Sequence, residues 1–300
     1  KAHMIVFLRK GYEETGSGRY AECLGDVTVI EKVVESNTQS GKSAIFVGFS
    51  PNDLWLNKTF ENKYYVFASP LGQAFSSPDF NEVRTLDQLI KAIDKGIITN
   101  AIVLSQALAD AYGFIFVQPY LNVEKMGRFD PAIKSGISLF GNKFRPHKNL
   151  LNEIRAAKEL QKSINQPILF NVDHHSIVNF LEQLNEKVLQ IEYKIISGLY
   201  DRQKLYDQMA SHSIHIECSF SESFSYMVLE NALLGVPSII GPNMYWFGDY
   251  VSRVSNIDDW REIHNAAACM MAYDRNVVSQ TAFQDNELWQ AESIKTVSIL

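Results

Sequence analysis

One stretch of the chain alternates strand, loop, helix and strand most clearly, and it runs Cys218-Ser-Phe-Ser-Glu-Ser-Phe-Ser-Tyr-Met-Val-Leu-Glu-Asn-Ala-Leu-Leu-Gly-Val-Pro-Ser-Ile-Ile-Gly241. Its apolar centre predicts a helix from Phe224 to Leu234. Gly235 suits the left-handed position that follows a helix, and Pro237 prevents the helix from continuing. Val236 to Ile240 then returns to the core as a strand. The pattern is typical of a sheet covered by helices.

The residues that precede this helix form a polar loop with an acid, Glu222, at its centre. Ser221 and Ser223 are good N-cap residues, because their hydroxyls accept hydrogen bonds from free amides of the first turn. Those amides and the helix dipole make the start of the helix a favourable place for an anion. A phosphate joined to a polyol is the natural ligand for such a loop.

A second acid, Glu230, stands inside the predicted helix among apolar residues. An unpaired carboxylate in such surroundings is strongly unfavourable. We therefore expect either hydroxyls or a cation as its partner, or a position on a solvated stripe with Ser223 and Asn231.

The spacing of Glu222 and Glu230, with seven residues between them, matches a family signature. The sequence S-E-S-F-S-Y-M-V-L-E-N-A-L-L-G-V-P resembles the E-x7-E element of the retaining GT-B glycosyltransferases, above all those of family 4. Serines stand where that element has two glycines, and Asn231 stands where it has alanine. The resemblance covers most of the second half of the chain but only a glycine loop and a hinge of the first half.

The length and the alternation of elements predict two domains of α/β class. A chain of 300 residues with 46 % hydrophobic residues is long enough for two medium-sized cores. Together with the resemblance, the alternation implies a GT-B fold, in which two Rossmann-like, doubly wound parallel-sheet domains face each other across a cleft. We place an acceptor-side domain at residues 1–128, a nucleotide-sugar-binding domain at 129–284, and a C-terminal helix that crosses back to the first domain at 285–300.

Short apolar runs mark the expected strands, which are Met4–Leu8, Val27–Ile30, Ser43–Phe49, Tyr64–Ala68, Asn100–Leu104, Ile115–Gln118, Ile137–Phe140, Ile168–Val172, Ile191–Ile196, Ile214–Glu217 and Val236–Ile240. Two expected helices begin at Gly18 and at Asp285, and a third ends near Leu160. The other expected helices cover Leu86–Ile93, Ser105–Tyr112, Arg202–Ala210, Phe224–Leu234 and Ile257–Tyr273.

A glycine loop, Thr15-Gly-Ser-Gly-Arg-Tyr-Ala21, follows the first strand. It formally matches G-x-G-x-x-A, the dinucleotide fingerprint, but that fingerprint turns directly after its strand, whereas seven residues separate Leu8 from Gly16. The loop also resembles the longer glycine loop of the family, where Gly16 and Gly18 would let the backbone approach a donor phosphate or an acceptor hydroxyl. An ordinary surface turn is the third interpretation.

A basic loop precedes the helix that ends near Leu160, and it resembles the family element that binds the donor diphosphate. Lys148 takes the place of the lysine that neutralises the phosphates. The partner arginine is replaced by Asn142, so Lys143 or Arg145 is expected to substitute for it. The alternative is a basic loop that binds no anion. The helix dipole disfavours that arrangement, because cations would then lie unneutralised at the positive end of the helix.

The resemblance also implies the roles of individual residues. Glu230 would bind the donor ribose, Glu222 would bind the transferred sugar, and Ile196 would offer its backbone to the base. The catalytic set is Glu222, Lys148 and Arg145, and the donor-binding set is Gly16, Gly18, Asn142, Lys143, Ile196, Ser223, Phe224, Ser225, Tyr226, Met227 and Glu230.

The sequence does not predict a metal or a cofactor. It contains no Asp-x-Asp pair, which metal-dependent GT-A transferases generally need. A metal at Asp173-His174-His175 is a minor alternative, because no third ligand stands at a suitable spacing. We therefore expect a metal-independent site with a nucleotide sugar as co-substrate.

Composition excludes other partners. The net charge of −6 and the absence of a long Lys/Arg run argue against nucleic-acid binding. No run approaches the roughly 18 apolar residues of a transmembrane segment, and no signal peptide is recognisable. Three cysteines without a C-x-x-C pair indicate a reducing compartment. We expect a soluble, cytoplasmic protein.

As a whole, the resemblance implies a retaining transferase that moves a hexose from GDP-mannose or UDP-glucose to a glycan or glycoprotein acceptor. Family members are usually longer, so this is a compact version, such as the chloroviruses encode. A histidine that the family often places beside the sugar is missing, because none occurs between His3 and His147. A nucleotide-sugar-binding protein without turnover and an NAD(P)-linked oxidoreductase remain alternatives.

Overall fold

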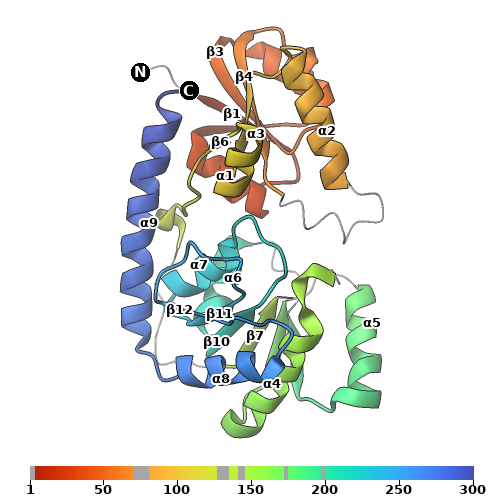
Figure 1. Cartoon of the computed structure of the whole chain (residues 1–300), viewed down its shortest axis with the longest axis vertical. Coiled ribbons are helices and arrows are strands. Elements are labelled where there is room, and N and C mark those ends of the chain that lie inside the picture. Colours follow the sequence, from red (N-terminus) through yellow and green to blue (C-terminus); the bar gives the residue numbers. More distant parts are fainter. Residues whose placement is uncertain (1–3, 70–80, 127–134, 141–145, 172–174, 197–200) are drawn as a thin grey trace. The chain divides into compact units, whose positions relative to one another are not determined.

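The structure is a computed structural model that describes residues 4–69, 81–126, 135–140, 146–171, 175–196 and 201–300. The chain divides into two compact units. Unit 1 comprises Lys1–Val123 and Asn286–Leu300, and unit 2 comprises Glu124–Asp285. Each unit contains one six-stranded sheet (Figure 1). The domain boundary that the sequence predicts after residue 128 lies outside the described residues.

Unit 1 is a parallel sheet with the strand order β2-β1-β3-β4-β5-β6. Its strands are β1 (Ile5–Arg9), β2 (Asp26–Ile30), β3 (Gly41–Val47), β4 (Phe60–Phe67), β5 (Asn100–Val103) and β6 (Ile115–Phe116). Its helices include α1 (Gly16–Leu24), α2 (Asn81–Asp94) and α3 (Gln106–Tyr112), with short 3-10 turns at Val33–Thr38 and Pro51–Leu56. The order reverses between β1 and β3, where ligands commonly bind in such sheets.

Unit 2 is a second parallel sheet, with the order β12-β11-β10-β7-β8-β9. Its strands are β7 (Ile137–Phe140), β8 (Ile168–Asn171), β9 (Tyr193–Ile196), β10 (Ile214–Glu217), β11 (Ser238–Ile240) and β12 (Val251–Arg253). Its helices include α4 (Leu150–Ile164), α5 (His175–Leu184), α6 (Arg202–Ala210), α7 (Tyr226–Leu233) and α8 (Trp260–Met270). Short turns lie at Val123–Lys125, where unit 2 begins, at Pro146–Lys148 and at Asn185–Leu189. Here the order reverses between β7 and β10.

The two cores explain why the apolar runs are continuous. Helices cover both faces of the unit 2 sheet, with α4 and α8 on one face and α6 and α7 on the other (Figure 1). A strand buried on both faces needs apolar side chains, as in the buried part of β3, residues 44–47, which reads Ala-Ile-Phe-Val. In unit 1 the core is rich in aromatic rings, and Phe7 stacks on Phe46 with 5.2 Å between the ring centroids.

The predicted fold class is confirmed, with differences at particular residues. Gly235 has φ = +73°, as its left-handed position requires. The helix before it begins at Tyr226, and its N-cap is Ser225, not Ser221 or Ser223. The predicted cap was wrong because the loop stays extended for two more residues, so that the Ser225 hydroxyl reaches the free amide of Val228.

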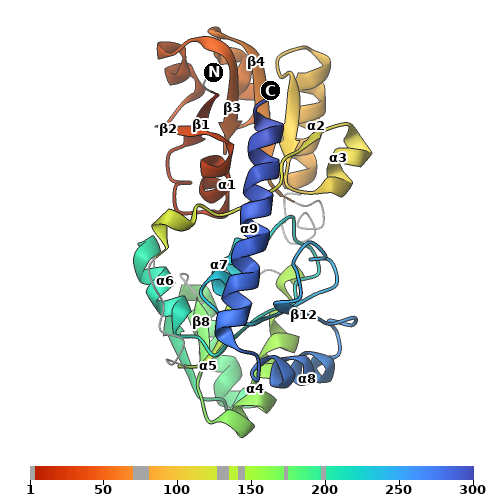
Figure 2. The same ribbon diagram turned by 90° about the vertical axis from the view of Figure 1, so that its left-hand side faces the viewer.

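The final helix, α9 (Arg275–Val297), begins ten residues before its predicted start and is one unbroken rod (Figure 2). Arg275 is buried at its first turn, where its guanidinium donates to the carbonyls of Ala210 at 2.7 Å and Gly235 at 2.9 Å. These partners lie far away in sequence, so no local pattern marks this start. Among the described residues, no helix is both long enough and apolar enough to cross a membrane.

Candidate active site

The strand reversal of unit 2 brings several charged residues to one edge of the sheet. β7 and β10 pair in parallel, with Ile137 opposite Ile214, so their carboxyl ends meet at the same edge. The short turn Pro146–Lys148 lies between β7 and α4, and the loop 218–225 follows β10. Parallel sheets bind ligands at such a point because the loops diverge there and leave room.

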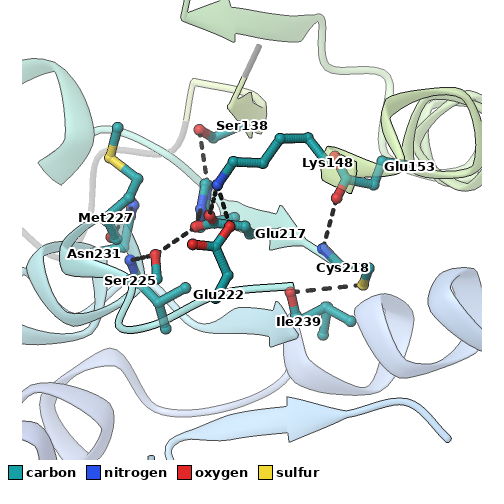
Figure 3. A network of polar contacts seen from close by, with 12 residues as sticks. Ser138, Lys148, Glu153, Glu217, Cys218, Glu222, Ser225, Met227, Asn231 and Ile239 are labelled. Carbon is teal, nitrogen blue, oxygen red and sulfur yellow. Dashed lines mark hydrogen bonds and ion pairs between the residues drawn. The ribbon is translucent and has the colours of Figure 1, made fainter. Parts of the chain in front are cut away.

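Lys148 is the centre of this cluster (Figure 3). Its Nζ atom lies 3.0 Å from Oε1 of Glu217 and also forms an ion pair with the carboxylate of Glu222. Burial lowers the pKa of Lys148, but the two carboxylates outweigh it, and the pKa lies above its usual value. Lys148 is therefore a buried, permanently charged ammonium group.

The two carboxyl groups on Lys148 differ in acidity. Burial opposes ionisation of Glu217, but Lys148 and His215 reverse that effect and hold the pKa of Glu217 below its usual range. Burial and the nearby charge of Glu217 raise the pKa of Glu222 despite the same lysine. As the pH falls, Glu222 is therefore the first of the two to take up a proton.

Glu217 also contacts the start of α7. Its Oε2 atom accepts a hydrogen bond of 2.7 Å from the Ser225 hydroxyl, which in turn accepts from the Val228 amide at 3.2 Å. On its other side, Nε2 of His215 lies 3.4 Å from the same oxygen, and Nδ1 of that ring lies 3.2 Å from the Ser138 hydroxyl. A continuous line of buried polar groups thus joins β7, β10 and α7.

A further acid, Glu153, lies on α4 and is 1 % exposed. It accepts a hydrogen bond of 2.6 Å from the amide of Cys218 (Figure 3). Burial is the main cause that raises its pKa well above the usual value. Sequence analysis did not identify Glu153 or Glu217, although an acid that ends a buried apolar strand was a usable signal for Glu217.

Five donor-binding residues of the predicted set lie together where the loop after β10 enters α7. They are Ser223, Phe224, Ser225, Tyr226 and Met227. Their neighbour in the loop is Glu222, so the structure brings the predicted sugar-binding acid and the helix start together.

Glu230 lies one helical turn further along α7 and is 1 % exposed. Its Oε1 atom accepts a hydrogen bond of 3.2 Å from the Tyr206 hydroxyl. The expected hydroxyl partner is therefore present. The other expectation, a solvated stripe with Ser223 and Asn231, is wrong, because all three residues are buried.

Other predicted residues are distributed more widely. Ile196 ends β9, which is two strands away from β7 in the sheet. Gly16 and Gly18 belong to α1 of unit 1. Asn142, Lys143 and Arg145 lie outside the described residues.

Gly18 has a packing reason to be glycine. A Cβ atom there would lie 2.3 Å from the carbonyl oxygen of Glu13 and 2.4 Å from that of Tyr12. The loop before α1 therefore folds back against the helix, and the Thr15 side chain caps it by accepting from the Gly18 amide at 3.3 Å. This close approach within the chain accounts for Gly18 without a ligand.

An aromatic cluster lies next to the loop of Glu222. Phe224 stacks on Trp246 with 6.0 Å between the ring centroids. When the amide of Asn243 is oriented to suit its neighbours, it accepts from the Glu222 amide at 3.0 Å and donates to the Ser219 carbonyl at 3.0 Å. The aromatic rings therefore lie beside the loop that carries Glu222.

Unit 1 has a hollow at its own strand reversal, with a volume of about 350 Å³. Residues at the carboxyl ends of β1, β3 and β4 line it, among them Arg9, Gly48 and Phe67, together with Tyr12 and Glu82. The Oε2 atom of Glu82 is buried and has no hydrogen-bond partner in the described part of the chain. The hollow thus offers a cation and a carboxylate oxygen to a polar ligand.

Within the described ranges, no group of three or more His, Cys, Asp or Glu residues is arranged to hold a metal ion. The Asp173-His174 pair lies outside those ranges. Two acids at the strand reversal, Glu217 and Glu222, pair with the buried ammonium of Lys148.

No family model matches the chain, and no curated protein matches it. Solved structures do match. Sucrose-phosphate synthase from Thermosynechococcus elongatus has a TM-score of 0.66 at 12 % identity, covering 99 % of this chain and 96 % of its own. Anabaena HepE in complex with UDP has a TM-score of 0.65 at 12 % identity, covering 99 % and 100 %.

A third match is S. aureus TarM in complex with fondaparinux, α-GlcNAc-glycerol and UDP, with a TM-score of 0.59 at 14 % identity over 85 % of this chain. This chain spans only 53 % of the length of TarM. The same architecture of two Rossmann-like parallel sheets recurs in all three. The chain therefore has the GT-B fold of the glycosyltransferases.

Proposed function

We propose that this protein is a nucleotide-sugar-dependent glycosyltransferase of the retaining, family-4 type. It transfers a hexose from UDP-glucose or GDP-mannose to a glycan or glycoprotein acceptor, without a metal ion. The observation that carries the proposal is the buried Lys148 ammonium, held beside the start of α7 at the strand reversal of unit 2. The fold similarity to enzymes solved with UDP supports the same function.

The leaving group of this reaction is a nucleoside diphosphate, whose negative charge grows as the bond to the sugar breaks. Lys148 and the free amides of the first turn of α7 are placed to stabilise that charge. Both are held in position before the ligand arrives. Preorganised donors of this kind each contribute about 3 kcal/mol to stabilising a transition state.

Glu222 and Glu230 have separate tasks in this proposal. Glu222 leaves Lys148 when phosphate arrives and binds hydroxyls of the transferred sugar. Glu230 binds the ribose in one of two ways. Either a ribose hydroxyl replaces the Tyr206 hydroxyl at Oε1 of Glu230, or the ribose binds to the second carboxylate oxygen. Both groups are satisfied in the free protein, so each carboxylate keeps a partner in both states.

We assign the acceptor to the hollow of unit 1. Its position at a strand reversal suits an acceptor with several hydroxyls, as does Oε2 of Glu82, which has no hydrogen-bond partner among the described residues. Arg9 adds a cation for an acceptor that carries an acidic group.

A nucleotide-sugar-binding protein without turnover is the second candidate. The observation that favours it is the absence of any histidine between His3 and His147, where family members often have one beside the sugar.

Calorimetric titration with UDP, GDP and NAD, followed by a donor-hydrolysis assay with UDP-glucose and GDP-mannose, tests these functions. We expect UDP or GDP to bind, NAD not to bind, and one of the two sugar donors to be hydrolysed. Binding without hydrolysis or transfer supports the second candidate, and binding of NAD alone rejects both. When the titration is repeated with Lys148→Ala, Lys162→Ala is the matched control. Lys162 pairs with Glu159 on the surface of the same unit.

A further inference from the structure

Glu217 divides its two oxygen atoms between different partners. Oε1 accepts from the Lys148 ammonium at 3.0 Å, whereas Oε2 accepts from the Ser225 hydroxyl at 2.7 Å. The residue is 3 % exposed, and its backbone is fixed in β10 between β7 and β11. One buried acid on a rigid strand therefore joins the cation of the site to the N-cap of α7 (Figure 3).

Both partners of Glu217 belong to the elements that the proposed function assigns to the diphosphate. Ser225 caps α7 and so sets the direction of its first free amides. Lys148 supplies the positive charge. Glu222 also contacts Lys148, but its role in sugar binding requires it to leave. Among the described residues, Glu217 is then the carboxylate that still holds the lysine.

We propose that Glu217 is a positioning residue, which holds the Lys148 ammonium and the first turn of α7 in one arrangement and thereby sets the affinity of the site for a nucleoside diphosphate. This inference rests on the proposed function. Glu217 does not touch the substrate; it acts through Lys148 and Ser225.

Charge alone predicts the opposite effect. Glu217→Gln removes a negative charge next to a site for an anion, which by itself should tighten binding. Loss of position should weaken binding, because glutamine keeps only one acceptor oxygen for the two donors, Lys148 and Ser225. The sign of the change in affinity therefore separates the two effects.

The experiment is a double-mutant cycle on UDP binding, measured by calorimetry with wild type, Glu217→Gln, Lys148→Ala and the double variant. We expect Glu217→Gln to weaken binding about tenfold in the wild-type background. In the Lys148→Ala background the same change should alter affinity by less than about twofold, because the lysine that it positions is gone. An unchanged or tighter Glu217→Gln, or an equal loss in both backgrounds, overturns the inference.

The dependence of UDP affinity on pH is a readout that a purely structural role would not move. Affinity should fall as the pH rises and Glu222 ionises, since the second carboxylate then competes with phosphate for Lys148. Glu217 contributes to the raised pKa of Glu222, and these two acids in turn raise the pKa of Glu153 on α4. In Glu217→Gln the fall should begin at a lower pH, whereas an unshifted profile rejects the inference.

Ser225 provides a second pair of variants in case Glu217→Gln does not fold. Ser225→Ala removes the hydroxyl that Glu217 holds, and Ser225→Thr keeps it. We expect several-fold weaker UDP binding for alanine and near wild-type binding for threonine. Equal affinities for the two variants contradict the inference. If the wild-type protein binds neither UDP nor GDP, the proposed function itself fails, and that result is distinguishable from a failure of Glu217.

Discussion

The two sheets share an architecture but differ at their carboxyl edges. In unit 1 the strand reversal forms an open hollow of about 350 Å³ above a core of aromatic rings. In unit 2 the corresponding edge is filled by Lys148, which Glu217 and Glu222 surround at side-chain exposures of 13 %, 3 % and 6 %. The same fold thus forms an open hollow in unit 1 and a buried ionic cluster in unit 2.

This difference separates residues that stabilise the fold from residues that prepare a site. Burying three charged groups carries a desolvation penalty that apolar side chains of similar volume would avoid. The core of unit 1 shows that this architecture does not require such a cluster. The ionic cluster of unit 2 therefore supports the proposal that the ligand binds there.

Removing the central lysine should have the largest effect. Lys148→Ala leaves Glu217 and Glu222 buried without their cation, so the free energy of unfolding should fall by about 3 to 5 kcal/mol. The exposed pair of unit 1, Lys91 with Asp87, is the comparison, and Lys91→Ala should change stability by less than about 1 kcal/mol. Urea unfolding followed by circular dichroism measures both.

If Lys148→Ala remains folded, it should weaken binding of UDP much more than binding of uridine, because the lysine acts on phosphate charge. Equal losses for the two ligands would contradict its role. If Lys148→Ala and Lys91→Ala have equal free energies of unfolding, the buried ion pairs of unit 2 contribute no more to stability than the exposed pair of unit 1.

Acid should destabilise unit 2 more than unit 1. Burial, with a smaller effect of His215, lowers the pKa of His212 to about 3. The folded unit keeps this histidine neutral, while the unfolded chain takes up a proton below about pH 6.5. Stability is therefore complete above that pH and falls towards pH 3 by up to about 1.4 kcal/mol per pH unit.

Hydrogen exchange measured by mass spectrometry reports the loss of stability separately for each unit. Unit 1 is the internal comparison, because its described part contains no histidine. His212→Leu is the matched variant, since neither ring nitrogen of His212 has a hydrogen-bond partner in the described structure. We expect leucine to flatten the pH dependence of unit 2. A slope that persists in His212→Leu would assign it to another group.

Substitutions of the two acids of the E-x7-E element should affect the binding of different ligands. Glu230→Gln weakens charge-assisted bonds to ribose, so affinity for UDP should fall about tenfold. Glu222→Gln should not weaken UDP binding, because its carboxylate competes with phosphate for Lys148, but it should reduce binding or turnover of the whole sugar nucleotide. Tyr206→Phe is the control for a structural role of Glu230, because it removes the hydroxyl that donates to Glu230 and keeps the ring.

Calorimetry with UDP and with UDP-glucose provides both comparisons. A Glu230→Gln variant that binds UDP as wild type does, or that only unfolds, would make this acid structural.

Chelation should have the smallest effect. Exhaustive treatment with EDTA should change transfer by less than about twofold, because Lys148 and the helix start supply the positive charge that a metal supplies elsewhere. Loss of activity that Mn²⁺ or Mg²⁺ restores would reject a metal-free site.

The sequence by itself determined the parts of this protein that depend on neighbouring residues. Continuous apolar runs identified the two parallel sheets, because a strand that is buried on both faces must be apolar throughout. Gly235 and Pro237 marked the end of α7, since left-handed backbone and a missing amide are properties of single residues. The spacing of Glu222 and Glu230 directed attention to α7 and to the loop before it, where Glu222 contacts Lys148.

Short elements without a strong pattern were beyond sequence reasoning. β12 has three residues, one of which is exposed, and it is stabilised by pairing with β11. The start of α9 depends on carbonyls that Arg275 meets from distant elements.

Only the tertiary structure decided the composition of the ionic cluster. Lys148 and Glu217 are separated by 69 positions, and they meet because β7 and β10 are neighbours at the strand reversal. Glu153 reaches the same cluster from α4 by binding the Cys218 amide. The acidity of each carboxyl group follows from burial and from the charges around it, and both exist only after the chain has folded.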